Sequence, residues 1–437
     1  MAAHAEDDPR RLVPRTDAVL ADPRLQEAIA RVGRGLVLES VRRAQDRVRA
    51  LDLEPGSVAD EALAQLPATA TTLQPVVNAT GVVVHTNLGR APLSAAAVAA
   101  IGVAAGYVDI ELDLATGRRS GRAPGTRAAM LAAVPAAEDA FAVNNGAAAL
   151  VLATTAMAAG REVVVSRGEL VEIGAGFRLP DLIESAGARL CEVGTTNRTS
   201  ARDYADAIGP DTGCILKVHP SNFSMAGFTS AVGVKELAGM GVPLVHDIGS
   251  GLLRPHPLLP DEPDVTSSLE AGAAVVTCSA DKLLGGPQAG LVFGRHAVVE
   301  RLQRHPLARA VRLDKLALAA LEATLRGPPA PVWEAIEADA ENLRMRCEAI
   351  VADLPQKLRA WTVTSDGVIG GGGAPGLTLT GWAVSLPAEF AGPLREGAQP
   401  VLARVEKGRC LLDLRCVPPE LDAVVTRAIV QAWQDQG

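Results

Sequence analysis

The apolar positions in the middle of the chain form short, nearly continuous runs that end in polar residues. Alanine-rich or amphipathic segments separate these runs, which lie at 140–145, 161–169, 214–222, 242–251 and 273–282. Strands that are buried on both faces have continuous apolar runs, and strands that alternate with helices form a parallel sheet covered on both faces. The pattern therefore predicts an α/β core with a mostly parallel sheet, which we assign to residues 76–330.

The chain before this core has a different pattern. Between residues 24 and 51, apolar residues recur at helical spacing, which predicts a long helical segment within a separate unit at residues 1–75. The stretch LPATATTLQP, residues 66–75, is typical of a linker.

The chain after the core has a third pattern. Residues 333–354 read WEAIEADAENLRMRCEAIVADL, and their spacing predicts one helix. Alternating strands such as 399–415 follow, and a helix closes the chain. We assign residues 331–437 to a small α+β domain.

The charge is distributed unevenly. The 437 residues carry a net charge of −8, which argues against a protein that coats nucleic acid non-specifically. Residues 10–49, however, hold ten arginines against five acidic residues. Two interpretations stay open for this segment, a solvated helix face and a phosphate-binding surface.

Several classes of protein are disfavoured by simple patterns. No apolar run reaches about 18 residues, so we expect no membrane-spanning helix. The first residues, MAAHAEDDPRR, lack the basic start and apolar stretch of a signal peptide, so we expect a cytoplasmic protein. None of the six cysteines forms a CxxC pair, so we expect no zinc ribbon and assign no metal site.

Polar residues with useful chemistry follow the apolar runs. The segment VNNGAAAL, residues 143–150, predicts a strand-to-helix turn, and the N-terminus of a helix suits a phosphate group. Asp247 ends a later run; such a carboxylate serves as a metal ligand, a base or the partner of a pyridinium nitrogen. Lys282 ends another run and precedes a Gly-Gly-Pro turn, so we expect it to be poorly solvated. Burial lowers the pKa of a lysine and favours a Schiff base.

The order phosphate turn, Asp, Lys resembles the aspartate-aminotransferase-like enzymes of fold type I, which use pyridoxal 5'-phosphate (PLP). In that family the aspartate keeps the ring nitrogen protonated and the lysine binds the cofactor covalently. The resemblance implies a PLP site formed by Lys282, Asp247, Asn145, Gly146, Ala147 and Ser279.

Longer motifs resemble the bacterial selenocysteine synthase family, the L-seryl-tRNA(Sec) selenium transferases. They are NATGVVVHTNLGRAPLS (78–94), SRGELVEIGAGFRLPD (166–181), EVGTTNRT (192–199), KVHPSNFSMAGFT (217–229), HDIGSGLL (246–253), DKLLGGPQAGL (281–291) and LARAVRLDKLALAALEATL (307–325). The resemblance covers nearly the whole chain. It implies conversion of seryl-tRNA(Sec) to selenocysteyl-tRNA(Sec) through a PLP-bound dehydroalanyl intermediate, with selenophosphate as the selenium donor. It also implies an N-terminal domain that binds tRNA(Sec), and a homo-oligomeric ring, a decamer built as a pentamer of dimers.

The resemblance also implies roles for individual residues. Lys282 would carry the cofactor, and Asp281 would assist beside it. The donor pocket would be formed by Arg90, Arg309 and Arg312, and ring contacts by Thr195 and Thr196. If the segment around Arg309 and Arg312 is helical, the two lie about one turn apart and suit a tetrahedral oxyanion; without the family match, two solvated arginines would be the default.

The chain departs from the family pattern in three places. Gly146 stands where a third asparagine is usual. Pro220, Phe223 and Ser224 replace Thr, Tyr and Arg. The segment RSGRAPGTR, residues 119–127, replaces one that bears tyrosine and histidine. No aromatic residue at 166–172 is available to stack on the PLP ring.

Two other functions stay open. A related PLP enzyme would act on a small amino acid or an amino sugar acid, but such relatives tend to lack the N-terminal helical domain. A non-catalytic assembly that binds tRNA is the second alternative, and the presence of Lys282 and Asp247 argues against it.

Overall fold

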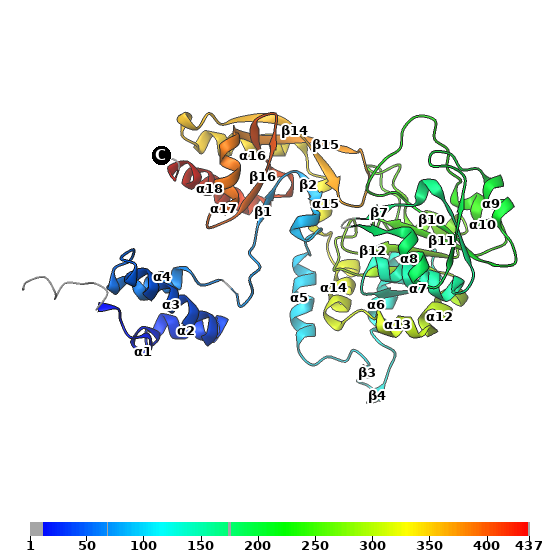
Figure 1. Cartoon of the computed structure of the whole chain (residues 1–437), viewed down its shortest axis with the longest axis horizontal. Helices are drawn as coiled ribbons and strands as arrows, with labels where there is room; N and C mark the ends of the chain where they lie inside the picture. Colours follow the sequence, from blue (N-terminus) through cyan, green and yellow to red (C-terminus); the bar gives the residue numbers. More distant parts are fainter. Residues whose placement is uncertain (1–11, 68, 174–175, 436–437) are drawn as a thin grey trace, which may run out of the picture. The chain divides into compact units, whose positions relative to one another are not determined.

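The computed structural model describes residues 12–67, 69–173 and 176–435. The chain divides into two compact units, and the boundary along the sequence falls between Val76 and Val77 (Figure 1). The division lies directly after the stretch that we expected to be a linker.

The described part of the first unit contains four α-helices, α1 (Thr16–Leu20), α2 (Pro23–Val32), α3 (Arg34–Arg49) and α4 (Val58–Ala64). Their apolar faces pack on one another, and Leu25, Val41 and Val48 are fully buried. The long helical segment that we predicted is interrupted, because Gly33 adopts a φ of +91° between α2 and α3. Glycine is the residue that adopts this conformation without steric cost.

The second unit contains a seven-stranded sheet in the order β5-β13-β12-β11-β10-β6-β9. The strands are β5 (Asp139–Val143), β6 (Glu162–Ser166), β9 (Arg189–Val193), β10 (Thr212–Val218), β11 (Leu244–Gly249), β12 (Val275–Ser279) and β13 (Gly290–Gly294). Five of them coincide with the predicted apolar runs. β9 and β13 were not predicted, and β13 runs antiparallel to both of its neighbours. The sheet is therefore mostly parallel.

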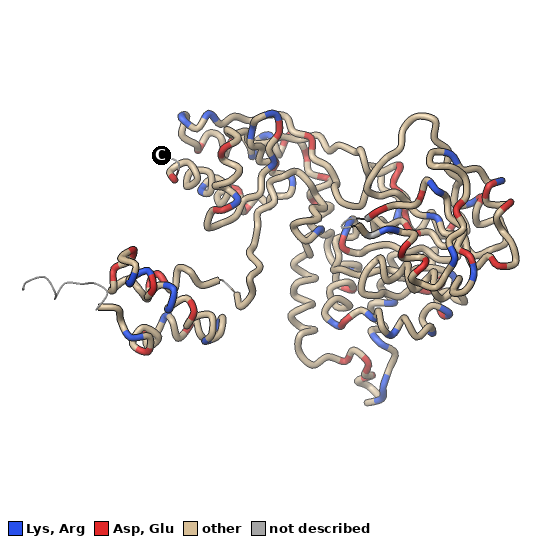
Figure 2. The backbone as a smooth tube through the Cα atoms, viewed as in Figure 1, with Lys and Arg blue, Asp and Glu red and all other residues tan. Residues whose placement is uncertain are grey.

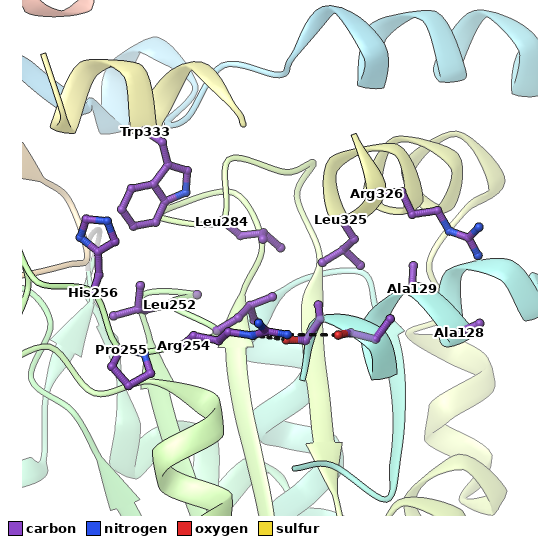
Figure 3. Close-up of a pocket in the computed structure, with 14 residues that line it drawn as sticks. Ala128, Ala129, Leu252, Arg254, Pro255, His256, Leu284, Leu325, Arg326 and Trp333 are labelled. Carbon is purple, nitrogen blue, oxygen red and sulfur yellow. Dashed lines mark hydrogen bonds between the residues drawn. The ribbon is translucent and has the colours of Figure 1, made fainter. Parts of the chain in front are cut away.

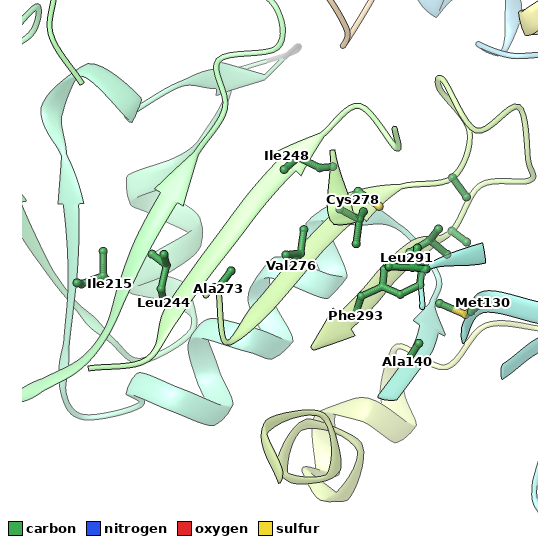
Figure 4. Packing of buried hydrophobic residues seen from close by; sticks show 14 of the residues in the cluster. Met130, Ala140, Ile215, Leu244, Ile248, Ala273, Val276, Cys278, Leu291 and Phe293 are labelled. Atoms are coloured by element: carbon green, nitrogen blue, oxygen red, sulfur yellow. The ribbon is translucent and has the colours of Figure 1, made fainter. Parts of the chain in front are cut away.

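Helices cover both faces of this sheet. The neighbouring residues Val275 and Val276 of β12 belong to two different apolar clusters. One cluster includes residues of α6 (Pro124–Ala133) and α14 (Lys315–Arg326), and Figure 4 shows Val276 and Phe293 packed in it. The other includes residues of α7 (Gly146–Ala158), α8 (Leu179–Ser185) and α12 (His296–Arg304). Continuous apolar runs are the sequence pattern that this two-sided burial requires.

A second sheet has the order β1-β16-β17-β15-β14-β2. Its strands are β1 (Val77–Ala79), β2 (Val82–Val84), β14 (Trp361–Gly370), β15 (Thr378–Pro387), β16 (Val401–Glu406) and β17 (Arg409–Asp413). We grouped residues 77–84 with the core from sequence, but β1 and β2 pair with strands of the C-terminal segment. Both are only three residues long, too short for a recognisable strand pattern.

The single helix predicted at 333–354 is wrong. The structure has α15 (Pro331–Ile336) and α16 (Ala340–Asp353), and the carboxylate of Asp339 accepts a hydrogen bond from the Asn342 N–H at 2.9 Å. An aspartate that caps the first turn in this way starts a new helix. Two further helices, α17 (Ala391–Glu396) and α18 (Asp422–Gln434), complete this part of the unit.

The remaining short elements connect these layers. They are α5 (Ala95–Ala105), α9 (Ala201–Ala207), α10 (Val234–Ala238), α11 (Val265–Glu270), α13 (Pro306–Ala310), and the small ladders β3 (Leu112–Asp113) with β4 (Arg118–Arg119) and β7 (Glu172–Ile173) with β8 (Phe177–Arg178). Within the described residues, no helix has both the length and the apolar character needed to cross a membrane.

Candidate active site

Lys282 lies in the turn that follows β12, partly accessible to solvent. The turn that joins β14 to β15 lies directly against it, because a Cβ on Gly372 would come within 2.4 Å of Lys282 Nζ. Burial lowers the pKa of Lys282, the charge of Asp247 raises it, and the charge of Arg90 lowers it. The net shift is downward, which enlarges the fraction of neutral amine, the form that attacks a carbonyl carbon.

Asp247 lies near the end of β11, beside β12 in the sheet. Its Oδ1 accepts a hydrogen bond from Thr277 Oγ1 at 2.8 Å. Burial raises the pKa of Asp247, while the bond from Thr277 and the charge of Lys282 act in the opposite direction. A carboxylate in such surroundings is ionised most readily when a cation lies next to it.

The N-terminus of α7 contacts the end of β12. Asn145 caps the helix, since its Oδ1 accepts a hydrogen bond from the Ala148 N–H at 2.8 Å. A Cβ on Gly146 would come within 2.5 Å of Ser279 Oγ, so this close approach requires a glycine. Ala147 is exposed, and the first N–H groups of a helix have no partner inside the helix. The predicted cofactor residues Asn145, Gly146, Ala147 and Ser279 therefore form one cluster, which we call the phosphate cradle.

Arg90 and Asp281 form an ion pair beside Lys282. Arg90 Nη1 lies 2.5 Å from Asp281 Oδ2, and the Ala91 N–H donates to the main-chain oxygen of Asp281 at 3.2 Å. The backbone of Arg90 has a φ of +71°, a conformation that few residues other than glycine adopt. Arg90 thus lies next to Lys282 of its own chain. The positive charge of Arg90 offsets the negative charge of Asp281.

Arg309 and Arg312 do not share one helix. Helix α13 ends before Arg312, which forms an isolated β-bridge with Val143 at the end of β5. The residue before Arg312 accepts a hydrogen bond from the Asn144 N–H at 2.9 Å. Arg312 is thus held at the strand end that leads into the phosphate cradle. Arg309 stays near enough for its charge to lower the pKa of Arg312.

Two further arginines surround Arg312, and sequence analysis did not identify them. Glu111 pairs with Arg119 at 2.7 Å, Arg122 at 3.0 Å and Arg312 at 3.5 Å. The charge of Arg122 is the largest cause that lowers the pKa of Arg312. Guanidinium groups outnumber the carboxylate here, and Figure 2 shows basic residues on the β3–β4 ladder. This excess of positive charge suits an oxyanion.

His219 lies beside Asp247 and also contacts Glu262. The His219 N–H donates to the Asp247 main-chain oxygen at 2.9 Å, and its Nε2 lies 3.2 Å from Glu262 Oε2. His219 lies within the polar end of the apolar run predicted at 214–222. Sequence analysis found no signal for Glu262, which lies in a loop without a periodic pattern.

Two of the several cavities in the second unit bear on the predicted residues. One of about 780 Å³ is bounded by α6, α14, α15 and the segment after β11 (Figure 3). In it the rings of His256 and Trp333 are 4.8 Å apart, and no predicted site residue lines it. The other, of about 560 Å³, is lined by Thr196 and His219 among others. Thr195 and Thr196 are both exposed, and their role in ring contacts stays a prediction.

Comparison with known proteins decides the family. Residues 76–418 match the family described as L-seryl-tRNA selenium transferase, and residues 10–49 match the one described as selenocysteine synthase N terminal. The chain belongs to the L-seryl-tRNA selenium transferase family. Together the two matches include most of both units and all the predicted site residues.

Individual relatives agree with this family. The L-seryl-tRNA(Sec) selenium transferase of Moorella thermoacetica is 42% identical, over 97% of each chain. That of Geobacter sulfurreducens is also 42% identical, over 92% of this chain and 95% of the relative. The solved structure of D-glucosaminate-6-phosphate ammonia-lyase covers 83% of this chain and 96% of its own, with a TM-score of 0.59 and 20% identity. The fold is aspartate-aminotransferase-like, fold type I, as predicted.

The residues of the site fit the PLP that this selenium transferase fold implies. An amine with a lowered pKa and a carboxylate lie on adjacent strand ends, at Lys282 and Asp247. The phosphate cradle adjoins β12 and offers helix N–H groups and a hydroxyl. Both charged side chains are partly accessible, so a ligand can reach them.

Proposed function

We propose that the protein transfers selenium from selenophosphate to seryl-tRNA(Sec) and so forms selenocysteyl-tRNA(Sec), with PLP as its cofactor. The observation that carries the proposal is the 42% identity over 97% of both chains to a relative with this activity in its name. The local geometry supports it, because the residues needed for such chemistry lie at neighbouring strand ends.

Three parts of the site would hold the cofactor. Lys282 would bind it covalently, Asp247 would pair with the ring nitrogen, and the phosphate cradle would bind the phosphate group. When bound, PLP supplies an electron sink for the charge that develops at the substrate Cα.

The chain itself supplies the base and the anion site. Once released from its covalent bond to the cofactor, Lys282 Nζ would remove the proton from the seryl Cα, and its lowered pKa would keep it available for this step. The ion pair of Arg90 and Asp281 fixes the surroundings of that amine. Arg309 and Arg312, with Arg122, hold the anionic selenium donor for attack at Cβ.

The first unit would bind tRNA. Arg31, Arg34 and Arg42 are exposed and form no ion pair with any described residue, whereas Arg24 and Arg47 pair with acidic residues inside the unit. Exposed guanidinium groups without a carboxylate partner are free to contact phosphates. The decameric ring and the cytoplasmic location stay predictions.

The two alternatives are separable by spectroscopy. We expect the purified holoprotein to show a visible cofactor band that borohydride bleaches, which a non-catalytic assembly would lack. Seryl-tRNA(Sec) should change this band and free serine should not. A response to free serine alone would favour the alternative enzyme for small amino acids.

A further inference from the structure

Glu262 is a buried carboxylate that links three parts of the second unit. It lies in the loop between β11 and α11, and its side chain is only 1% exposed. Its Oε2 contacts His219 Nε2 at 3.2 Å and accepts a hydrogen bond from the Ala374 N–H at 2.7 Å. Its Oε1 is buried without a hydrogen-bond partner among the described residues. Burying a carboxylate in this way lowers the stability of the fold unless its hydrogen bonds and ion pairs compensate for the lost hydration.

The Ala374 N–H belongs to the turn 370–376, which joins β14 to β15 and which we call the glycine turn. Gly372 of this turn lies against the Lys282 amine, and a Cβ on Gly373 would lie 3.2 Å from Leu283 Cδ1. Ala374 has a φ of +43°, a strained conformation for alanine. The turn therefore needs an external contact to keep its shape, and Glu262 supplies one.

We propose that Glu262 is a positioning residue for Lys282, because its carboxylate holds the glycine turn against the lysine and holds His219 at the end of β10. The inference rests on one part of the proposed function, namely that Lys282 carries the cofactor. Because a carboxylate only accepts hydrogen bonds, it also fixes His219 Nε2 as a donor.

The charge of Glu262 also acts on Lys282. The charged groups that face this amine are Asp247, Arg90, Asp281 and Glu262, and the three carboxylates favour its protonated form while Arg90 opposes it. Loss of the Glu262 charge makes protonation of the Lys282 nitrogen less favourable. Deprotonation then occurs at a lower pH.

The test compares holoprotein variants in two measurements. Glu262→Gln keeps a carbonyl oxygen for both partners but loses the charge, so the pH midpoint of the visible cofactor band should fall by up to about 1 unit. Glu262→Ala loses the hydrogen bond as well, so the Ala374 amide should exchange its hydrogen about tenfold faster. Glu337→Gln is the control. Glu337 also pairs with a histidine, His256 at 3.3 Å, but its side chain is far more exposed than that of Glu262. Its charge is not among those that shift the pKa of Lys282.

Should Glu262→Ala not fold, Glu262→Asp replaces it in the exchange measurement. The side chain is one methylene shorter, so Ala374 should exchange faster while the pH midpoint stays near that of the wild type. The proposal is wrong if Glu262→Gln has the same midpoint as Glu337→Gln, or if exchange at Ala374 is unchanged in the shortened variant. A wild-type holoprotein without any visible band would instead contradict the proposed function.

Discussion

Lys282 is the residue on which the proposed chemistry depends. Lys282→Ala should lose the visible cofactor band after dialysis, because no other amine faces Asp247 and the phosphate cradle among the described residues. Lys235→Ala removes an exposed lysine and should keep the band. Reduction with borohydride followed by peptide mapping should place the cofactor on Lys282. Label on Lys217, which already pairs with Glu169 at 2.7 Å, would refute the assignment.

Arg312 provides a second prediction at the scale of single residues. Loss of one charged hydrogen-bond partner typically costs about 1.5–3 kcal/mol, or roughly ten- to a hundredfold in affinity. Arg312→Ala should therefore raise the apparent KM for selenophosphate by about that factor and leave the cofactor spectrum unchanged. Arg427→Ala, which removes an exposed arginine of α18, is the control. A fall in tRNA affinity with an unchanged donor KM would assign Arg312 to the RNA surface.

Individual site residues differ in how far the sequence identified them. Lys282, Asp247 and His219 follow apolar runs, so their positions at strand ends follow from the pattern of the sheet. Arg122 and Glu262 come from loops, and Arg119 comes from the two-residue strand β4. Arg122 donates a hydrogen bond to the Leu313 main-chain oxygen and Glu262 accepts one from the Ala374 N–H, so both positions depend on contacts between segments far apart in the sequence. No local pattern carries that information.

The phosphate cradle depends on the contact between α7 and β12. In Gly146→Ala the new Cβ would overlap Ser279 Oγ, so the affinity for PLP should fall roughly tenfold or more. Adding Ser279→Ala removes the overlapping atom, so the double variant should bind PLP as tightly as the Ser279→Ala variant does. Gly392→Ala is the control, because a Cβ there has no neighbour within 4 Å. Wild-type affinity in Gly146→Ala, measured by titration of the apoprotein, would show that the cradle does not bind the cofactor.

The sequence predicted helices and strands correctly where burial alone determines which residues they contain. The runs that became β5, β6, β10, β11 and β12 are covered by helices on both sides and are therefore apolar throughout. β13 was missed because its first and last residues are glycines, and both pack closely on neighbouring backbone. The helix expected at 333–354 was broken by a capping aspartate, whose effect depends on a single hydrogen bond.

At the scale of the whole molecule, the first unit should bind tRNA without taking part in the chemistry. Replacing Arg31, Arg34 and Arg42 by alanine should weaken tRNA(Sec) binding and reduce its salt dependence by about two counterions or more, because each phosphate contact releases counterions. The visible cofactor band should not change. Arg427→Ala again serves as the control. Unchanged tRNA affinity in the triple variant would contradict the role of this surface.

The central claim is that this chain forms selenocysteyl-tRNA(Sec) with Lys282 as the essential amine. The most direct test incubates the PLP-loaded protein with seryl-tRNA(Sec) and selenium-labelled selenophosphate, and then identifies the amino acid released from the tRNA. We predict labelled selenocysteine with the wild-type protein and none with Lys282→Ala. Unchanged serine on the tRNA after incubation with a wild-type protein that shows its cofactor band would contradict the account.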